Sequence, residues 1–191
     1  MRGVLEDLAA EVLCTARATV PIDARRVARS VGLTCIRAPI DTACLVDETV
    51  FYPYVRRRRG HGLVAHETAH FLLQAHGLPD TESNADYLGA ALLVPLPRLL
   101  LDLETVGIDL DELQRVHANA SATLLVTRVA EAVGGRASLW HAGGLVWSRP
   151  MLSRALPLIA AQVYATGRPL SVDGECYGWP LGRAYVAALD L

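Results

Sequence analysis

The 191-residue sequence predicts an α+β fold, in which a helical core packs on a small antiparallel β-sheet and a C-terminal hairpin and helix extend the same body. Two patterns indicate this class. Apolar residues recur at helical spacing through most of the first 133 residues, and three β-branched or aromatic segments lie close together between residues 33 and 54. Hydrophobic residues make up 52% of the chain and charged residues 20%, which is typical of a folded globular protein.

Two helices are predicted before the sheet. Apolar spacing gives the first, over residues 4–16. Pro21-Ile22-Asp23 opens the second, over residues 24–31, and Gly32 follows in the position where a helix commonly ends.

Three strands are predicted next, over residues 33–37, 43–46 and 49–54, because these segments are rich in β-branched and aromatic side chains. Asp47-Glu48 is a plausible turn between the last two. The expected sheet is antiparallel.

A long helix is predicted over residues 62–75. Gly77 follows its last turn and Pro79 stops it, as is usual at helix C-termini. Asp80-Thr81 then provides an N-cap for a helix over residues 82–94.

The remaining sequence predicts three short helices, followed by a segment with a different pattern of hairpin and helix signals. The helices are expected at 97–106, 110–117 and 122–133. We place a boundary there: residues 1–134 form the domain that carries the chemistry, and residues 135–191 form an extension. In the extension, Gly143-Gly144 indicates a hairpin and residues 151–165 a helix. The extension contains three tryptophans, which are expected to pack in a core or lid: Trp140, Trp147 and Trp179.

The segment His66-Glu67-Thr68-Ala69-His70 is the strongest chemical signal. Its two histidines are four residues apart on a predicted helix, so they project from one face about one turn apart. Two neutral imidazoles can hold one Zn²⁺ at about 2.0–2.1 Å. Glu67 lies beside the pair, where its carboxylate can take a proton from an activated water without filling a ligand position. Taken alone, the motif leaves open a histidine-bearing helix with a surface glutamate.

A catalytic zinc of this type needs a third protein ligand, and Glu82 is the preferred candidate. It opens the helix that follows the Gly-Leu-Pro-Asp turn, and a tight reversal would lay that helix antiparallel to the first and return Glu82 to the metal. Asp86 is four residues further on, where it can hold a ligand histidine in the right tautomer. Both acids would also complement the helix dipole.

Two other histidines are weaker candidates. His76 lies ten residues after His66, the spacing of the metzincin motif H-E-x-x-H-x-x-G-x-x-H, but Leu73 replaces the glycine that breaks the helix there. In an unbroken helix, ten residues turn through about 1000° and take His76 off the shared face. His117 could donate a hydrogen bond to a reaction oxyanion, although a structural role is more usual for a lone histidine at a helix end.

Three segments, in order, resemble motifs of the ImmA/IrrE family of bacterial and phage metallopeptidases. Val20-Pro21-Ile22-Asp23 with Gly32-Leu33 resembles the family's opening, and residues 65–70 resemble its A-H-E-l-g-H core. Residues 82–95 resemble E-x-x-A-n-x-F-A-x-x-L-L-x-P. Leu88-Gly89 replaces the usual Phe-Ala, and Ala69 replaces a glycine. The resemblance covers residues 10–133.

This resemblance implies a zinc metallopeptidase in which His66, His70 and Glu82 bind one Zn²⁺ and Glu67 is the catalytic base. It also implies a protein substrate, a helix-turn-helix repressor whose cleavage releases stress-response or mobile-element genes. The net charge of −2 favours neither nucleic acid nor an anionic membrane as a partner. We expect a cytoplasmic protein, because the first residues include acids where a signal peptide has an apolar run.

Other interpretations stay open at this point. The run Arg56–Arg59 is either a solvated loop, which we favour, or a docking site for an acidic segment of a partner. Residues 109–132 could form a helix-turn-helix, with Thr123, Thr127 and Arg128 as its exposed residues, but two core-packing helices are favoured.

A different class of function is a zinc-containing module that sequesters a regulator without cutting it. Glu67 argues against this, because a purely structural site does not need it.

Overall fold

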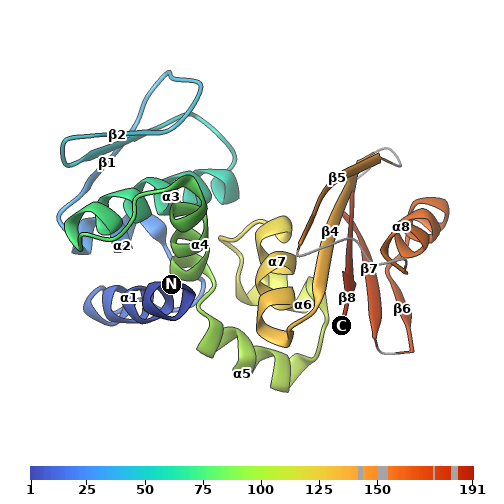
Figure 1. Ribbon diagram of the computed structural model, residues 1–191. Coiled ribbons are helices and arrows are strands. Elements are labelled where there is room, and N and C mark those ends of the chain that lie inside the picture. The colour runs from blue at the N-terminus through green and yellow to red at the C-terminus, as the bar shows by residue number, and fades with distance from the viewer. Residues whose placement is uncertain (142–143, 150–154, 174, 182–184) are drawn as a thin grey trace. The chain divides into compact units, whose positions relative to one another are not determined.

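The computed structural model describes residues 1–141, 144–149, 155–173, 175–181 and 185–191. It has the predicted α+β class (Figure 1). The chain divides into two compact units, of which the first comprises Met1–Thr105 and Glu112–Ser121, and the second Val106–Asp111 and Ala122–Leu191. The helix at 122–133 belongs to the second unit, where it packs on two strands.

The core of the first unit is built mainly from three helices, α1 (Arg2–Thr15), α3 (Arg57–Ala75) and α4 (Glu82–Leu93). Helix α3 packs extensively on α4 and also contacts strands β2 and β3 and helix α2 (Ala24–Ser30). The side chains at the centre of this core are almost all aliphatic. Those whose exposed fraction is 1% or less include Leu5, Val27, Ala69, Leu73, Ala85, Leu88, Ala91 and Leu92. This apolar burial is the main stabilising contribution to the unit.

The helix ends follow the local sequence signals closely. The Asp23 side chain accepts a hydrogen bond from the Arg25 amide at 3.0 Å and caps α2. Gly32, just beyond α2, has a φ of +92°, which glycine adopts without a steric penalty. The Thr81 hydroxyl caps α4 through the Asn84 amide at 3.2 Å. Helix α3 starts at Arg57 instead of residue 62, so the arginine run is its exposed first turn and not a loop.

The small sheet is mixed, which corrects the expected antiparallel sheet over 33–54. Strands β1 (Thr34–Arg37), β2 (Cys44–Val46) and β3 (Thr49–Tyr52) lie in the order β1-β3-β2. The tight turn at Asp47, whose φ is +51°, pairs β2 with β3 in antiparallel fashion. The segment 38–43 does not form a hairpin, and β1 pairs instead with the far side of β3 in parallel. As a result β2 is an edge strand.

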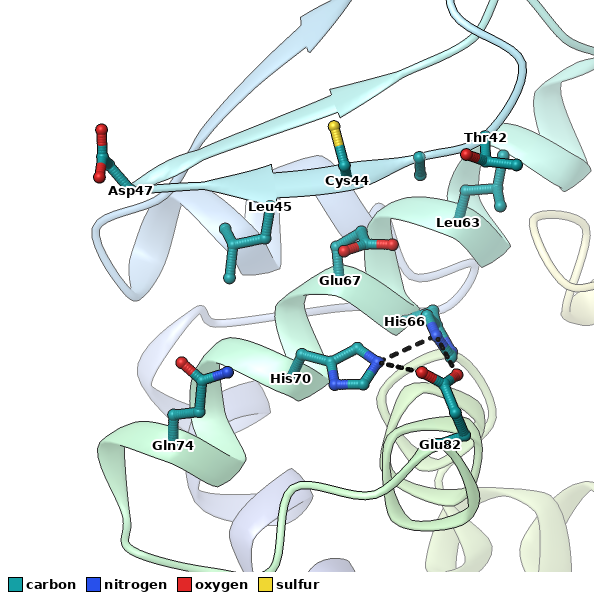
Figure 2. A pocket seen from close by; sticks show the side chains of 11 residues that line it. Thr42, Cys44, Leu45, Asp47, Leu63, His66, Glu67, His70, Gln74 and Glu82 are labelled. Carbon is teal, nitrogen blue, oxygen red and sulfur yellow. Dashed lines mark hydrogen bonds and ion pairs between the residues drawn. The ribbon is translucent and has the colours of Figure 1, made fainter.

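Helices α3 and α4 approach each other closely at Gly89. A Cβ atom built there would lie 3.2 Å from the backbone carbonyl carbon and oxygen of Ala65 and from the Cα atom of His66. Figure 2 looks nearly along α4 while α3 crosses the view, so the two helices cross and do not run antiparallel as expected. The absence of a side chain at residue 89 lets α4 pack directly against the backbone of the turn that carries His66.

The second unit is a five-stranded antiparallel sheet covered on both faces. Its strands lie in the order β5 (Gly144–Arg149), β4 (Arg136–His141), β8 (Tyr185–Asp190), β7 (Cys176–Leu181) and β6 (Leu170–Val172). Helix α7 (Ala122–Val133) packs on β4 (Arg136–His141) and β8 (Tyr185–Asp190), and α8 (Ala155–Thr166) packs on the opposite face in Figure 1. Consecutive residues 186–189 of β8 are all buried, as a strand covered on both faces requires.

The C-terminal segment after α8, for which no strands were predicted, supplies three strands of this sheet. These are β6 (Leu170–Val172), β7 (Cys176–Leu181) and β8, and β5 (Gly144–Arg149) is the other arm of the predicted hairpin. Gly178 in β7 marks where α8 packs closely, because a Cβ atom there would lie 2.6 Å from Ile159 Cγ2. A residue without a side chain is therefore required at position 178 for this packing. Of the turn expected at Gly143-Gly144, the first residue lies outside the described residues, as does the helix start expected at 151–154.

The helix-turn-helix interpretation does not agree with the burial of α7. Leu125, Val126 and Val129 face the core, and Arg128, one of the residues considered for reading DNA bases, is fully buried and pairs with Glu131 at 2.9 Å. Trp140 and Trp179 are 8% and 7% exposed, as expected of core residues. The side chain of Trp147 lies outside the described residues. No helix in the described part of the chain is both long enough and apolar enough to cross a membrane.

A buried histidine joins two short helices of the first unit. Asp102, on α5 (Leu96–Val106), accepts from His117 Nε2 at 2.9 Å and from Arg98 Nε at 3.1 Å. His117 follows α6 (Leu110–Val116) and is 1% exposed. Burial lowers the pKa of His117 below its usual value, and this outweighs the opposing effect of Asp102.

The low pKa of His117 predicts a pH-dependent stability. The unfolded chain binds a proton at His117 more readily than the folded one, so the contribution is full above the unfolded pKa near 6.5 and decreases as the pH falls below it. His117→Gln keeps a donor toward Asp102 but does not titrate. We expect the free energy of unfolding, measured by urea denaturation in EDTA, to fall less between pH 7 and pH 5 in this variant than in the wild type. Equal slopes would contradict the assignment.

Candidate metal centre

A cleft of about 710 Å³ lies in the first unit between α3 and the edge strand β2 (Figure 2). The α3 side presents His66, Glu67 and His70, and Glu82 reaches in from the first turn of α4. The opposite wall is formed by residues 42–45 and Asp47. The histidine-glutamate motif therefore faces an open, solvent-accessible cleft and not a packed core.

Three side chains in this cleft point at one another. His66 Nε2 and His70 Nε2 are 3.2 Å apart. Glu82 Oε2 lies 3.3 Å from His66 Nε2, and Glu82 Oε1 lies 3.6 Å from His70 Nε2. These residues form the group that could hold a metal ion among the described parts of the chain.

The distances fit a tetrahedral ion. Ligand atoms about 2.0–2.1 Å from a tetrahedral Zn²⁺ are separated from one another by about 3.3–3.4 Å, close to the three separations in the cleft. Two imidazole nitrogens and one carboxylate, with a fourth position open to the cleft, also match the donor set of catalytic zinc sites. The residues present therefore fit Zn²⁺.

Each histidine ring interacts through Nδ1 with a carboxylate. Asp86 Oδ1 lies 3.1 Å from His66 Nδ1, in the position that the Glu-x-x-x-Asp spacing predicts, and Asp80 Oδ1 lies 2.5 Å from His70 Nδ1. An ionised carboxylate only accepts hydrogen bonds, so the ring protons are on Nδ1 and the Nε2 lone pairs face the cleft. The hydrogen bond to Asp86 raises the pKa of His66 above its usual value.

Glu67 lines the same cleft but stands apart from the three ligand candidates. It is half-buried and comes from the α3 face that looks toward β2 (Figure 2). Leu45 and Cys44 of β2 line the wall opposite. Glu67 is therefore placed to act on a molecule in the cleft while the ligand positions are filled by other side chains.

The two weaker histidine candidates do not reach this cleft. His76 is the exposed C-cap of α3 and is not part of the metal-binding group. His117 is buried against Asp102, away from the residues that line the cleft, which removes it as an oxyanion donor there. In both cases the helix geometry, and not the residue type, decides the outcome.

Sequence reasoning missed Asp80, which was considered only as a helix cap. Thr81 caps α4, and this leaves the Asp80 carboxylate to bind His70 and to accept from Gln74 Nε2 at 2.7 Å. The hydrogen bond from Gln74, followed by that from His70, lowers the pKa of Asp80 below its usual value. The sequence did contain a signal for this role. Thr81 is itself a good helix cap, so the acid directly before it, Asp80, was not needed as one.

Comparisons with known proteins give the fold alone. No protein-family model matches the sequence, and no curated protein matches it. A solved structure of a Mycobacterium tuberculosis transcriptional regulator is similar, with a TM-score of 0.72 at 13% identity, over 98% of this chain and 75% of that one. The shared architecture thus extends over both units.

The role of Asp80 can be tested with a matched pair of variants. Asp80→Asn keeps the shape of the side chain but weakens the acceptor for His70, so we expect Zn²⁺ affinity to fall by about 10- to 100-fold. Asp47→Asn makes the same change at another acid of the cleft that is not hydrogen-bonded to a histidine, and should leave affinity unchanged. Competition with a chromophoric chelator measures both. Equal affinities in the two variants would remove Asp80 from the site.

Proposed function

We propose that this protein is a zinc-dependent endopeptidase. The observation that carries the proposal is the convergence of His66 Nε2, His70 Nε2 and a Glu82 carboxylate oxygen in an open cleft that also contains Glu67. A purely structural zinc site is closed by four protein ligands. A site with three ligands, an accessible fourth position and an adjacent carboxylate is typical of a hydrolase.

Glu67 is the proton carrier in the proposed reaction. When bound, Zn²⁺ supplies Lewis acidity, which polarises a peptide carbonyl and lowers the pKa of a water toward about 7. Glu67 takes a proton from the water while the water oxygen attacks the carbonyl carbon of the peptide. The carboxyl group then gives a proton to the amide nitrogen as the C–N bond breaks, so that one water is consumed for each bond cut. Asp80 and Asp86 accept from Nδ1 of the two imidazoles and so direct the Nε2 lone pairs toward the metal position.

The edge strand favours an extended peptide as substrate. One side of β2 pairs with β3, and its other side is open for a further strand. Residues 42–45 of this segment form a wall of the cleft opposite His66 and Glu67. A peptide that adds to β2 through main-chain hydrogen bonds would lie across the metal position, with little dependence on its sequence.

The resemblance of the sequence motifs to ImmA/IrrE peptidases suggests a helix-turn-helix repressor as the protein cut. The similar solved structure is named a transcriptional regulator, which is in keeping with a role in transcriptional control. The alternative is a zinc-containing module that binds a regulator without cutting it, since the same three ligands would serve such a module. The two candidates differ in whether Glu67 is needed.

Glu67→Gln tests the catalytic proposal. The amide cannot accept the proton of water, so we expect cleavage to slow by about 10²–10⁴-fold or more, while zinc content stays at one ion per chain because Glu67 is not a ligand. New N-termini would be measured by mass spectrometry after incubation of the zinc-loaded protein with a cell lysate of its source organism. Glu11→Gln, an exposed change on α1, is the control for loss of a carboxylate.

Cleavage by Glu67→Gln at the wild-type rate would refute the role of the glutamate. Capture of a regulator by both proteins, without fragments, would favour the binding module instead.

A further inference from the structure

A second cavity of about 280 Å³ lies in the first unit, at the opposite end of α3 from Gly77. It is lined by Arg25, Arg37, Tyr52, Arg57, Gly60 and His61. It shares no lining residue with the metal cleft. Three arginines around one small cavity repel one another, so an anion bound among them would stabilise their arrangement.

The first turn of α3 has free donors at this cavity. No side chain caps the helix at Arg56, and no acid lies in its first turn, among the residues described for this 19-residue helix. The first amide groups of a helix lack intrahelical partners and carry the positive end of the dipole. Acids are normally favoured there, but α3 has arginines at 57, 58 and 59. An anion bound in the cavity would interact favourably with the helix dipole and with Arg57, which lines the cavity.

His61 adds a buried donor that has no partner. Its side chain is 2% exposed, and Nδ1 accepts a hydrogen bond from the Ala24 amide at 3.2 Å. Burial lowers the pKa of His61, so the neutral ring carries its proton on Nε2. Within the described part of the chain, Nε2 has no hydrogen-bond partner. An unsatisfied buried donor costs about 1–3 kcal/mol, and a ligand oxygen in the cavity would remove that cost.

The nearby charges indicate the class of anion. Asp23 lies beside the cavity, 3.3 Å from Arg25 Nε and 3.7 Å from His61 Nδ1. It offsets one of the three arginines and leaves an excess of two positive charges. Arg37 also stacks over the Tyr52 ring at 5.8 Å, which orients its guanidinium.

We propose that this cavity binds the phosphate group of a small molecule, either inorganic phosphate or a phosphate monoester. A phosphate dianion matches the excess charge, and its oxygens can accept from the guanidinium groups, the α3 amides and His61 Nε2. The site is independent of the proposed peptidase activity, because it involves none of the metal-binding residues.

Calorimetric titration of the zinc-loaded full-length protein with inorganic phosphate, and separately with adenosine monophosphate, tests the proposal at fixed ionic strength. We expect at least one of these two compounds to bind, with a stoichiometry of one phosphate group per chain. Arg57→Gln and Arg37→Gln, both at exposed positions, should each weaken binding by about tenfold or more. Tighter binding of the nucleotide would identify a phosphate monoester as the ligand, and tighter binding of inorganic phosphate would identify the free ion.

Two control variants make the result specific. Arg58→Gln removes the same charge from the same helical turn, but Arg58 Nε donates to the Ala118 carbonyl at 3.1 Å and does not line the cavity. It should bind phosphate as the wild type does. His66→Ala, which breaks the metal centre, should do the same. The proposal would be overturned if either control variant lost phosphate binding. It would also be overturned if acetate bound as strongly as phosphate, or if neither inorganic phosphate nor adenosine monophosphate bound.

Discussion

The close contact between α4 and the backbone of α3 is the constraint on which the metal centre depends. Gly89 leaves no side chain between the helices, and the Ala65 carbonyl would be only 3.2 Å from a Cβ atom there. This contact positions α4 so that Glu82, in its first turn, reaches the two imidazoles of α3. Because the ligands come from two helices, a bound ion would also hold these helices together, and metal binding would add to the stability of the first unit.

Charge is distributed along α3 in two groups with different partners. The N-terminal turn has arginines beside a cavity with an excess of positive charge, whereas the middle of the helix presents two imidazoles, each hydrogen-bonded to a carboxylate. The first arrangement suits an anion and the second a cation. Both depend on the same 19-residue helix, whose apolar face is buried in the core formed with α1 and α4. One helix of the first unit thus carries both the group that could hold a metal ion and the cavity proposed to bind an anion.

Local signals in the sequence were enough to place the helices of the first unit and the two histidines. Helical periodicity, Gly32 and Thr81 gave element ends close to the observed ones. The crossing of α3 and α4, the parallel pairing of β1 with β3 and the strands after residue 167 depend on contacts between distant residues, which local patterns do not contain. Asp80 was missed for the same reason, since its partner His70 precedes it by ten residues across a turn.

X-ray absorption at the zinc edge of the zinc-loaded protein would show whether His66, His70 and Glu82 together bind one Zn²⁺. We expect nitrogen and oxygen neighbours at about 2.0–2.2 Å from the ion, with two imidazoles and no sulfur, and the loss of one oxygen ligand or of the metal in Glu82→Ala. A sulfur scatterer at about 2.3 Å from a cysteine such as Cys44, or an unchanged spectrum in Glu82→Ala, would contradict it.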